Sequence, residues 1–175
     1  MPQDIKVSMI LLQSLDGFIA KNQNDKLDWG SKEDKQNYKA KTVEIGAIIC
    51  GTNTYLQVPD FALKNRKVYV LTNRPEEIPD KEGVVLFKGS PQSLIEKIKS
   101  EGITKVAVVG GGKIYNSFLS ANLVDEIFVT IAPVAFGVGI HGFGDSILTN
   151  KFELVSVDKM GEGEVYLHYR VKWSS

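Results

Sequence analysis

A carboxylate near the start of the first predicted helix is the side chain best suited to chemistry. Asp34 and Tyr38 are four residues apart, so they share one face of that helix. A carboxylate in an apolar cleft could accept two charge-assisted hydrogen bonds from the N–H pair of an aminopyrimidine or pterin. It could also relay a proton to an imine nitrogen as a hydride arrives. Trp29, just before the helix, is expected either to line such a cleft or to pack in the core.

A purely structural explanation of Asp34 competes with this interpretation. Ser31-x-x-Asp34 matches a capping box, in which the Asp34 side chain would return a hydrogen bond to the Ser31 backbone. A helix cap is worth about 0.5–2 kcal/mol, which accounts for the residue without a ligand. The spacing alone leaves both interpretations open.

Three consecutive glycines indicate a second kind of chemistry, the binding of phosphate. Gly110, Gly111 and Gly112 lie between a predicted strand at 105–109 and a predicted helix at 114–119. Free N–H groups at a helix start attract a phosphate, and missing side chains let a pyrophosphate approach the main chain. A tight turn without a ligand is the alternative. Because these glycines come late in the chain and lack the G-x-G-x-x-G spacing, a Rossmann dehydrogenase is disfavoured.

Two further strand ends carry hydroxyl, amide and cationic groups that could contact an anionic ligand. They are Gly51, Thr52, Asn53 and Thr54 after one predicted strand, and Thr72, Asn73 and Arg74 after another. Thr and Asn also cap helices that bind nothing, so neither segment is specific alone. Three such loops in one sheet favour a long anionic ligand such as a dinucleotide.

The elements that must position these residues alternate between strand and helix. Strands are predicted at 5–12, 45–50, 67–72, 84–87, 105–109 and 124–132, and helices at 31–43, 52–56, 91–100 and 114–119. After a glycine-rich loop at 133–144, residues 152–159 and 164–172 alternate as a hairpin. This order predicts an α/β fold with a mostly parallel, eight-stranded sheet, helices on both faces and an antiparallel C-terminal hairpin. Ligands bind beyond the carboxyl ends of strands in such sheets.

Composition narrows the class of protein. The length of 175 residues predicts a single domain, residues 1–175. Lys plus Arg and Asp plus Glu both number 21, which argues against nucleic-acid or membrane-surface binding. One cysteine, Cys50, permits no internal disulfide, is expected in the core and suits the reducing cytoplasm. With only His141 and His168 as histidines, no metal site is expected.

Several segments in this order resemble the dihydrofolate reductase superfamily. They are S-L-D-G-F-I-A at 14–20, L-D-W at 27–29, G-T-N-T-Y at 51–55, V-G-G-G-K-I-Y at 109–115, L-V-D-E at 123–126 and P-V-A-F-G-V-G at 133–139. They look most like the C-terminal reductase domain of the riboflavin-pathway bifunctional deaminase–reductase and its stand-alone relatives. The fold is therefore expected to be dihydrofolate reductase-like, and the relatives suggest a homodimer.

The resemblance implies NADPH as the hydride donor and assigns residues to it. Ala20 would border the nicotinamide, the triple glycine would meet the pyrophosphate, and residues 52–54 and 72–74 would approach the adenosine half. The resemblance also implies that the neighbours of the glycines contact the cofactor, namely Val109, Lys113, Ile114 and Tyr115. Tyr115 would lie between the cofactor and the substrate. For the substrate, the resemblance implies Asp34 as the catalytic carboxylate, with Trp29, Tyr38 and Thr130 shaping the pocket.

Two departures from the family pattern bear on specificity. The arginine that often contacts the 2′-phosphate is Thr52 here, and one lost charge-assisted contact is worth about 1.5–3 kcal/mol, or roughly 10- to 150-fold. Arg74 could supply that contact. The Asp-Asp-Pro…Arg stretch of the riboflavin reductase is also missing, with residues 58–61 in its place, and no deaminase domain is expected.

The sequence therefore predicts an NADPH-dependent reductase acting on a small heterocycle, a ribosylaminopyrimidine or a pteridine. Dihydrofolate reductase proper is the alternative from the same fold. A non-catalytic dinucleotide-binding protein is the rival from another class, and it predicts tight NADPH binding without turnover. A flavin-binding module is a further possibility that a colourless protein would contradict.

Overall fold

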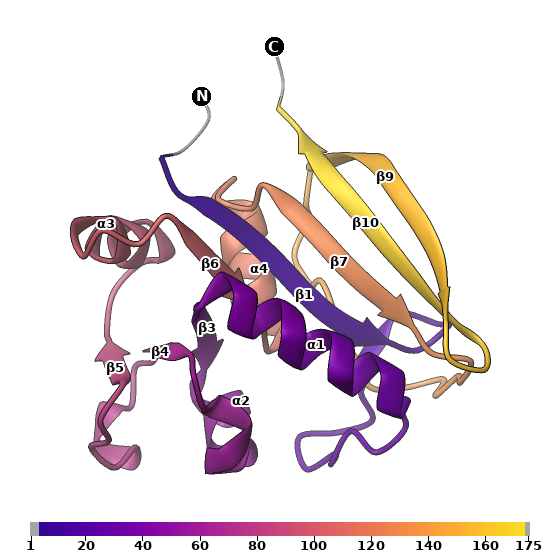
Figure 1. The fold of residues 1–175 in the computed structure, drawn as a ribbon, viewed down its shortest axis with the longest axis horizontal. Coiled ribbons are helices and arrows are strands. Elements are labelled where there is room, and N and C mark those ends of the chain that lie inside the picture. Colours follow the sequence, from indigo (N-terminus) through magenta and orange to yellow (C-terminus); the bar gives the residue numbers. More distant parts are fainter. Residues whose placement is uncertain (1–3, 174–175) are drawn as a thin grey trace.

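Eight strands form one sheet in the computed structural model, which describes residues 4–173. They are β1 (Lys6–Gln13), β3 (Ala47–Gly51), β4 (Lys67–Leu71), β5 (Val84–Phe87), β6 (Lys105–Val108), β7 (Glu126–Ile131), β9 (Lys151–Met160) and β10 (Glu164–Lys172). Their order across the sheet is β5-β4-β3-β6-β1-β7-β10-β9 (Figure 1). The strands from β5 to β7 pair in parallel, whereas β10 pairs antiparallel with both β7 and β9. The expected fold class and terminal hairpin are confirmed.

Helices cover both faces of this sheet because the strand residues alternate between two apolar clusters. The helices are α1 (Lys32–Ile45), α2 (Thr52–Gln57), α3 (Pro91–Ser100) and α4 (Gly112–Ser120), with short 3-10 segments at Asp60–Leu63 and Pro75–Glu77. Ile49 belongs to the cluster that α3 and α4 cover, while Ile48 and Cys50 belong to the cluster beneath α1 and α2. Figure 1 shows α1 in front of the sheet and α4 behind it. Cys50 is buried and unpaired, as expected for a core thiol.

The structure corrects several predicted boundaries. Helix α1 continues to Ile45, and β3 starts only at Ala47, because Gly46 ends the helix in a left-handed conformation (φ 89°) with its N–H bonded to the Thr42 carbonyl. Two stretches in which no strand was predicted contain β2 (Phe18–Ala20) and β8 (Ile140–His141), which pair antiparallel with each other. Strands of two and three residues are too short to show an alternating sequence pattern, so the sequence could not indicate them.

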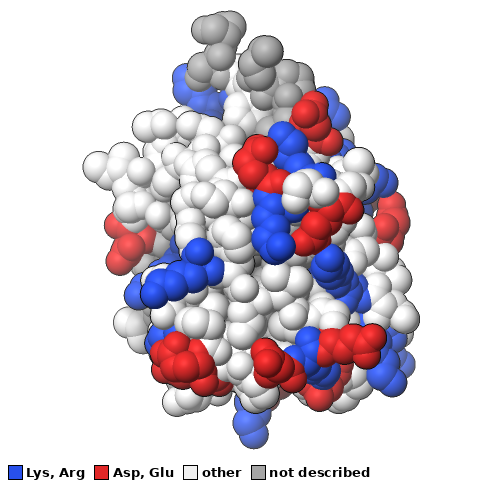
Figure 2. Space-filling model, turned by 90° about the vertical axis from the view of Figure 1, so that its left-hand side faces the viewer, with Lys and Arg blue, Asp and Glu red and all other residues white. Residues whose placement is uncertain are grey.

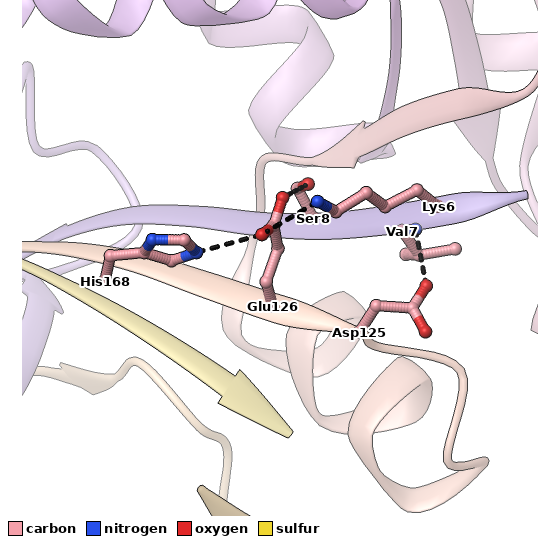
Figure 3. Close-up of polar contacts among 6 residues, drawn as sticks. All are labelled: Lys6, Val7, Ser8, Asp125, Glu126 and His168. Atoms are coloured by element: carbon pink, nitrogen blue, oxygen red, sulfur yellow. Dashed lines mark hydrogen bonds and ion pairs between the residues drawn. The ribbon is translucent and has the colours of Figure 1, made fainter. Parts of the chain in front are cut away.

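The acidic pair of the L-V-D-E segment holds β7 to its neighbours, far from the predicted site. The Asp125 carboxylate accepts a hydrogen bond from the Val7 N–H at 2.8 Å. Glu126, on β7, accepts one from the Ser8 hydroxyl at 2.8 Å and lies 2.9 Å from His168 Nε2 (Figure 3). Because these contacts join β1, β7 and β10 at the amino end of β7, this segment of the resemblance has a structural function.

The charged surface is mixed. Figure 2 shows Lys and Arg side chains interspersed with Asp and Glu on the side of the molecule that holds β5. Among residues 4–173, no helix has the length and apolar character needed to cross a membrane. The same residues contain no group of three or more His, Cys, Asp or Glu side chains placed to hold a metal ion.

Candidate active site

The three predicted phosphate-facing loops meet at one edge of the sheet. They follow β3, β4 and β6, which are adjacent, parallel strands, so their carboxyl ends lie side by side. The Gly51 N–H donates to the Gly110 carbonyl at 2.9 Å. Methyl groups added at Gly110 and Gly111 would lie 3.4 and 3.5 Å from the Thr54 hydroxyl oxygen. The loops that the sequence singled out separately therefore form one surface.

Hydrogen bonds link the β3 and β4 loops within that surface. The buried hydroxyls of Thr52 and Thr72 are 2.7 Å apart, and the Arg74 N–H donates to the Thr72 hydroxyl at 2.9 Å. The Arg74 guanidinium donates to the Asn53 amide oxygen at 3.1 Å. Asn73 lies exposed between them. A cation and several amide and hydroxyl groups are thus held beside the glycines.

The first turn of α4 has free backbone donors. Gly111 is the N-cap of α4 and provides no side-chain cap, and the Gly110–Gly111 peptide bond is cis. By contrast, the side chains of Ser31 and Ser90 cap α1 and α3. Within residues 4–173, no acceptor is hydrogen-bonded to the N–H of Gly110 or Gly111. An anion at this helix start would therefore meet unpaired N–H groups and the positive end of the helix dipole.

The β2–β8 pair brings Ala20 to the same place. A methyl group at Gly112 would lie 2.6 Å from the His141 carbonyl oxygen, so β8 packs directly on the start of α4. Ala20 pairs with Ile140 in this small sheet. Ala20, remote in sequence from the glycines, is consequently a near neighbour of the α4 N-terminus.

The remaining predicted cofactor residues have different environments. Lys113 is exposed on the first turn of α4, and Val109 is half-buried before the glycines. The half-buried Ile114 packs on Gly51, where an added methyl group would lie 2.9 Å from its Cγ1. Tyr115 is buried in the core, and its hydroxyl donates to the Ile10 carbonyl at 2.6 Å. The Tyr115 hydroxyl is therefore already engaged with the chain.

Asp34 faces the sheet and is paired with Thr130. Helix α1 buries only two residues, Asp34 and Thr42, both polar, on the side where a surface helix usually places apolar ones. The Thr130 hydroxyl donates to Asp34 Oδ1 at 2.6 Å within the buried interior. Burial raises the pKa of Asp34, the Thr130 hydrogen bond opposes that rise, and the negative charge of Glu164 adds to it.

The capping-box interpretation of Asp34 is wrong. The Ser31 hydroxyl does accept from the Asp34 N–H at 3.0 Å, so Ser31 caps the helix. The Ser31 N–H, however, donates to Glu164 Oε1 at 2.7 Å and not to the Asp34 carboxylate. Asp34 Oδ2 accepts no hydrogen bond from the described residues, and it lies 3.6 Å from the position of a methyl group added at Gly30. One carboxylate oxygen is thus free for a ligand.

Trp29 forms a wall of a cavity beside this carboxylate. The indole is half-buried, its N–H donates to Asp25 Oδ2 at 3.2 Å, and its ring packs edge-on against Phe136 with centroids 5.0 Å apart. The cavity has a volume of about 220 Å³ and is also lined by Ser31 and Pro133. Trp29 therefore lies at the cavity and outside both apolar clusters, and its role in binding stays a prediction. Tyr38 instead packs against the core beneath α1, and burial raises its pKa.

The structure adds two acidic residues that the sequence did not assign to the site. Glu164 is 4 % exposed, with Oε1 on the Ser31 N–H and Oε2 buried without a hydrogen bond. Asp16 accepts hydrogen bonds from the N–H groups of Phe136 and Gly137, at 3.1 and 2.7 Å, and so fastens the loop after β7. Their sequence neighbourhood carried no signal of either contact. A second cavity, of about 320 Å³ beside Gly46 and Thr104, contains none of the predicted site residues.

The sheet order and the helices on both faces define a dihydrofolate reductase-like fold. The structure of Enterococcus faecalis dihydrofolate reductase complexed with NADP(H) and RAB-propyl matches with a TM-score of 0.71 and 21% identity, over 95% of this chain and 96% of that chain. Residues 5–166 match the RibD C-terminal domain, and the chain belongs to that family. The expected resemblance is confirmed.

Relatives within this family extend the comparison. The chain is 28% identical over 171 residues to the uncharacterized protein YwjB of Bacillus subtilis, covering 94% of this chain and 97% of YwjB. It is 32% identical over 74 residues to the 2,5-diamino-6-ribosylamino-4(3H)-pyrimidinone 5′-phosphate reductase of Archaeoglobus fulgidus, covering 41% of this chain and 33% of that protein. The Thermotoga maritima diaminohydroxyphosphoribosylaminopyrimidine deaminase/5-amino-6-(5-phosphoribosylamino)uracil reductase matches with a TM-score of 0.78 and 21% identity, over 96% of this chain and 57% of that chain. The chain is thus similar to reductases of riboflavin biosynthesis.

Proposed function

We propose that this protein is an NADPH-dependent reductase of the riboflavin-pathway type, transferring a hydride to a ribosylaminopyrimidine or a pteridine. The observation that carries the proposal is the convergence of three strand-end loops on the uncapped N-terminus of α4. An elongated anionic cofactor could lie across these loops, with its diphosphate on the α4 amides and its adenosine half toward Thr52 and Arg74. The family membership supports the same assignment.

The chain's own residues would bind and orient, while the cofactor when bound supplies the hydride. Ala20 and the start of α4 would hold the nicotinamide end at the β2–β8 pair. The free Oδ2 of Asp34 would accept an N–H of the substrate ring, and Thr130 would keep the carboxylate in that orientation. Because burial raises the pKa of Asp34, this group is also suited to hold a proton for a ring nitrogen.

Turnover assays test this function directly. The purified protein is incubated with NADPH and either 5-amino-6-ribosylaminouracil phosphate or 7,8-dihydrofolate, and the loss of NADPH absorbance is followed. Oxidation of NADPH with the first substrate is expected. Tight NADPH binding without turnover of either would favour the non-catalytic dinucleotide-binding protein, and absence of NADPH binding would refute the proposal.

Arg74 is the proposed basis for a preference for NADPH over NADH. Its guanidinium is paired with Asn53 and, at 2.8 Å, with the Glu77 carboxylate, so a 2′-phosphate would have to replace Glu77. Since Arg74 is half-exposed, the low end of the range for a charge-assisted contact applies. Arg74→Ala should weaken NADPH binding about tenfold with little effect on NADH. Glu77→Gln, the matched control, should leave NADPH binding unchanged or tighter.

Dihydrofolate reductase proper is the second candidate, favoured by the Asp34–Thr130 pair and by Trp29 five residues before Asp34. The substitution Asp34→Asn separates the two. It should abolish folate reduction, in which a ring nitrogen must gain a proton, but could spare reduction at a ribose carbon. Asp28→Asn, at an exposed position of the preceding loop, is the control and should change neither activity.

We also propose that the protein is cytoplasmic and forms a homodimer. The terminal hairpin supports the dimer, because Leu154, Val155 and Val157 of β9 are 51%, 43% and 55% exposed. Exposed apolar groups of this kind mark protein–protein contacts. Sedimentation velocity should give the mass of two chains, and Val157→Lys should give one. A monomeric wild-type protein would contradict the dimer.

A further inference from the structure

The cavity beside Trp29 has a buried acceptor that the chain leaves unused. Glu164 lines this cavity, and its Oε2 is buried without a hydrogen bond. Buried polar atoms in native proteins almost always have a partner, either from the chain or from a bound molecule. The other oxygen, Oε1, accepts from the Ser31 N–H at 2.7 Å, so the chain satisfies only one of the two carboxylate oxygens.

The charge around the cavity selects the kind of partner. Its walls are Trp29, Gly30, Ser31, Pro133, Val134, Glu162, Gly163 and Glu164. Two of these residues are carboxylates and none is Lys or Arg, and Asp34 lies three residues beyond Ser31 on the adjoining helix. An anion such as a phosphate would be repelled here, whereas a cation or an N–H donor would be attracted.

The size and the apolar walls of the cavity indicate the shape of the molecule that it would bind. A volume of about 220 Å³ is below the roughly 300–1,000 Å³ of pockets for drug-sized ligands, so the cavity suits one planar ring system. The Trp29 ring offers an aromatic surface on which a cation is attracted by the π-electrons. Val134 and Pro133 add apolar surface beside it.

We propose that this cavity is a binding subsite for a planar, amidine-like cation or N–H donor, which lies against Trp29 and donates a hydrogen bond to Glu164 Oε2 as that side chain turns toward it. The inference rests on the proposed function, to which it adds that the donor-rich ring edge of the substrate is held by a second carboxylate besides Asp34. Any phosphate of the substrate would lie outside this cavity.

A matched pair of probes tests the subsite without any turnover. Benzamidine and benzoate are both planar and similar in size, but one is an amidinium and the other a carboxylate. The chain has two tryptophans, so Trp173→Phe leaves Trp29 as the only fluorescent indole. In this background benzamidine should quench the fluorescence saturably, and benzoate should not. Equal binding of the two probes would overturn the proposal.

Substitutions at the carboxylate sharpen the test. Glu164→Gln keeps an oxygen for the Ser31 N–H but removes the charge, and it should weaken benzamidine binding by about 10- to 150-fold. Glu153→Gln, an exposed position on β9, is the control and should not change it. Undiminished binding to Glu164→Gln would overturn the proposal. If that variant does not fold, Val134→Phe, which fills the cavity from its apolar wall, should abolish binding, and retained binding would overturn it.

The same variants distinguish this inference from the proposed function. NADPH binding involves other loops, so it should be equal in the wild-type protein and in Glu164→Gln. A protein that binds benzamidine through Glu164 but fails to bind NADPH would refute the reductase while leaving the subsite standing. A protein that binds and oxidises NADPH, yet shows no Glu164-dependent benzamidine binding, would refute the subsite alone.

Discussion

The substitution Thr130→Val measures the energy of the contact that holds Asp34 against the sheet. Valine keeps the shape of threonine but removes the hydroxyl that donates to Asp34 Oδ1 at 2.6 Å. Thr130 and Asp34 are 2% and 8% exposed, so water cannot readily replace the lost donor. A hydrogen bond to a charged group is worth about 1.5–3 kcal/mol. At about 2–4 °C per kcal/mol for a chain of this length, the melting temperature should fall by about 3–12 °C at neutral pH.

The loss should depend on pH in a defined direction. The Thr130 hydrogen bond favours the ionised carboxylate, so removing it raises the pKa of Asp34 further above its ordinary value of 3.8. The destabilisation is therefore complete only above the pKa of Asp34 in the folded protein. Below the ordinary value the carboxyl is protonated, and the bond lost is a neutral one worth about 0.5–1.5 kcal/mol. Thermal and urea denaturation across this pH range measure the cost of the substitution with Asp34 ionised and with Asp34 protonated. An unchanged m-value in urea would show that the substitution alters stability and not the extent of unfolding.

A double-mutant cycle gives the result that would refute this reasoning. In an Asp34→Asn background the amide oxygen still accepts from Thr130, but no charge is present, so Thr130→Val should cost less than in the wild-type protein. Asp34→Asn itself should stabilise the fold at neutral pH, since a carboxyl with a raised folded pKa loses stability as the pH rises through that pKa. An equal cost of Thr130→Val in both backgrounds would show that the two side chains are not coupled.

Three further substitutions test the contacts around the site. In Gly112→Ala the added methyl group would lie 2.6 Å from the His141 carbonyl oxygen. The substitution should therefore lower the free energy of unfolding in urea by about 1–3 kcal/mol and weaken NADPH binding. Unchanged stability would show that β8 can move aside. Glu126→Gln should destabilise the protein fully above the ordinary glutamate pKa of 4.5, and the difference should disappear only below the pKa of Glu126 in the folded protein, which lies lower; a pH-independent difference would contradict this. Asp16→Asn should speed amide hydrogen exchange at Phe136 and Gly137, and unchanged exchange would show that other contacts hold that loop.

The positions of most strands and helices along the chain could be predicted because apolar runs and glycine positions determine them locally. The apolar runs at 45–50 and 105–109 predicted strands, and the polar loops after them were therefore expected at the carboxyl edge of the sheet. The β2–β8 pair could not be predicted, since it depends on a contact between residues 18–20 and 140–141. Ala20 was assigned to the site only because of the family resemblance. The structure shows the contact that places it there, which is the pairing of Ala20 with Ile140.

The two explanations of Asp34 could not be separated by sequence, because a capping box and a catalytic carboxylate need the same residue at the same spacing. The structure excludes the capping box because the Ser31 N–H donates to Glu164, a residue 133 positions further along the chain. Tyr115 shows the same limit in reverse. The resemblance implied a cofactor contact for Tyr115, but the direction of its side chain follows from the fold, which turns the hydroxyl to the Ile10 carbonyl.

The β7 strand shows why hydrogen-bond satisfaction separates a structural carboxylate from a functional one. Glu126 and Thr130 lie on the same face of this strand, at opposite ends, and each joins a buried carboxylate to neighbouring elements. Burial would raise the pKa of Glu126, but hydrogen bonds from Ser8 and His168 and the nearby Lys6 outweigh it and lower the pKa. Glu126 therefore has its charge fully compensated by the chain and gains nothing from a ligand.

Asp34 is the opposite case. Only one oxygen of the buried Asp34 carboxylate, Oδ1, accepts a hydrogen bond from the described residues. Burial raises the pKa of Asp34, and the negative charge of Glu164 adds to that rise. A buried carboxylate with one unsatisfied oxygen lowers folding stability. The chain nevertheless has one at the carboxyl edge of the sheet. A bound N–H donor would supply the missing compensation, so binding and stability should be linked: a substrate ring should raise the melting temperature of the wild-type protein more than that of Asp34→Asn. Equal shifts in the two proteins would show that the ring does not contact this carboxylate.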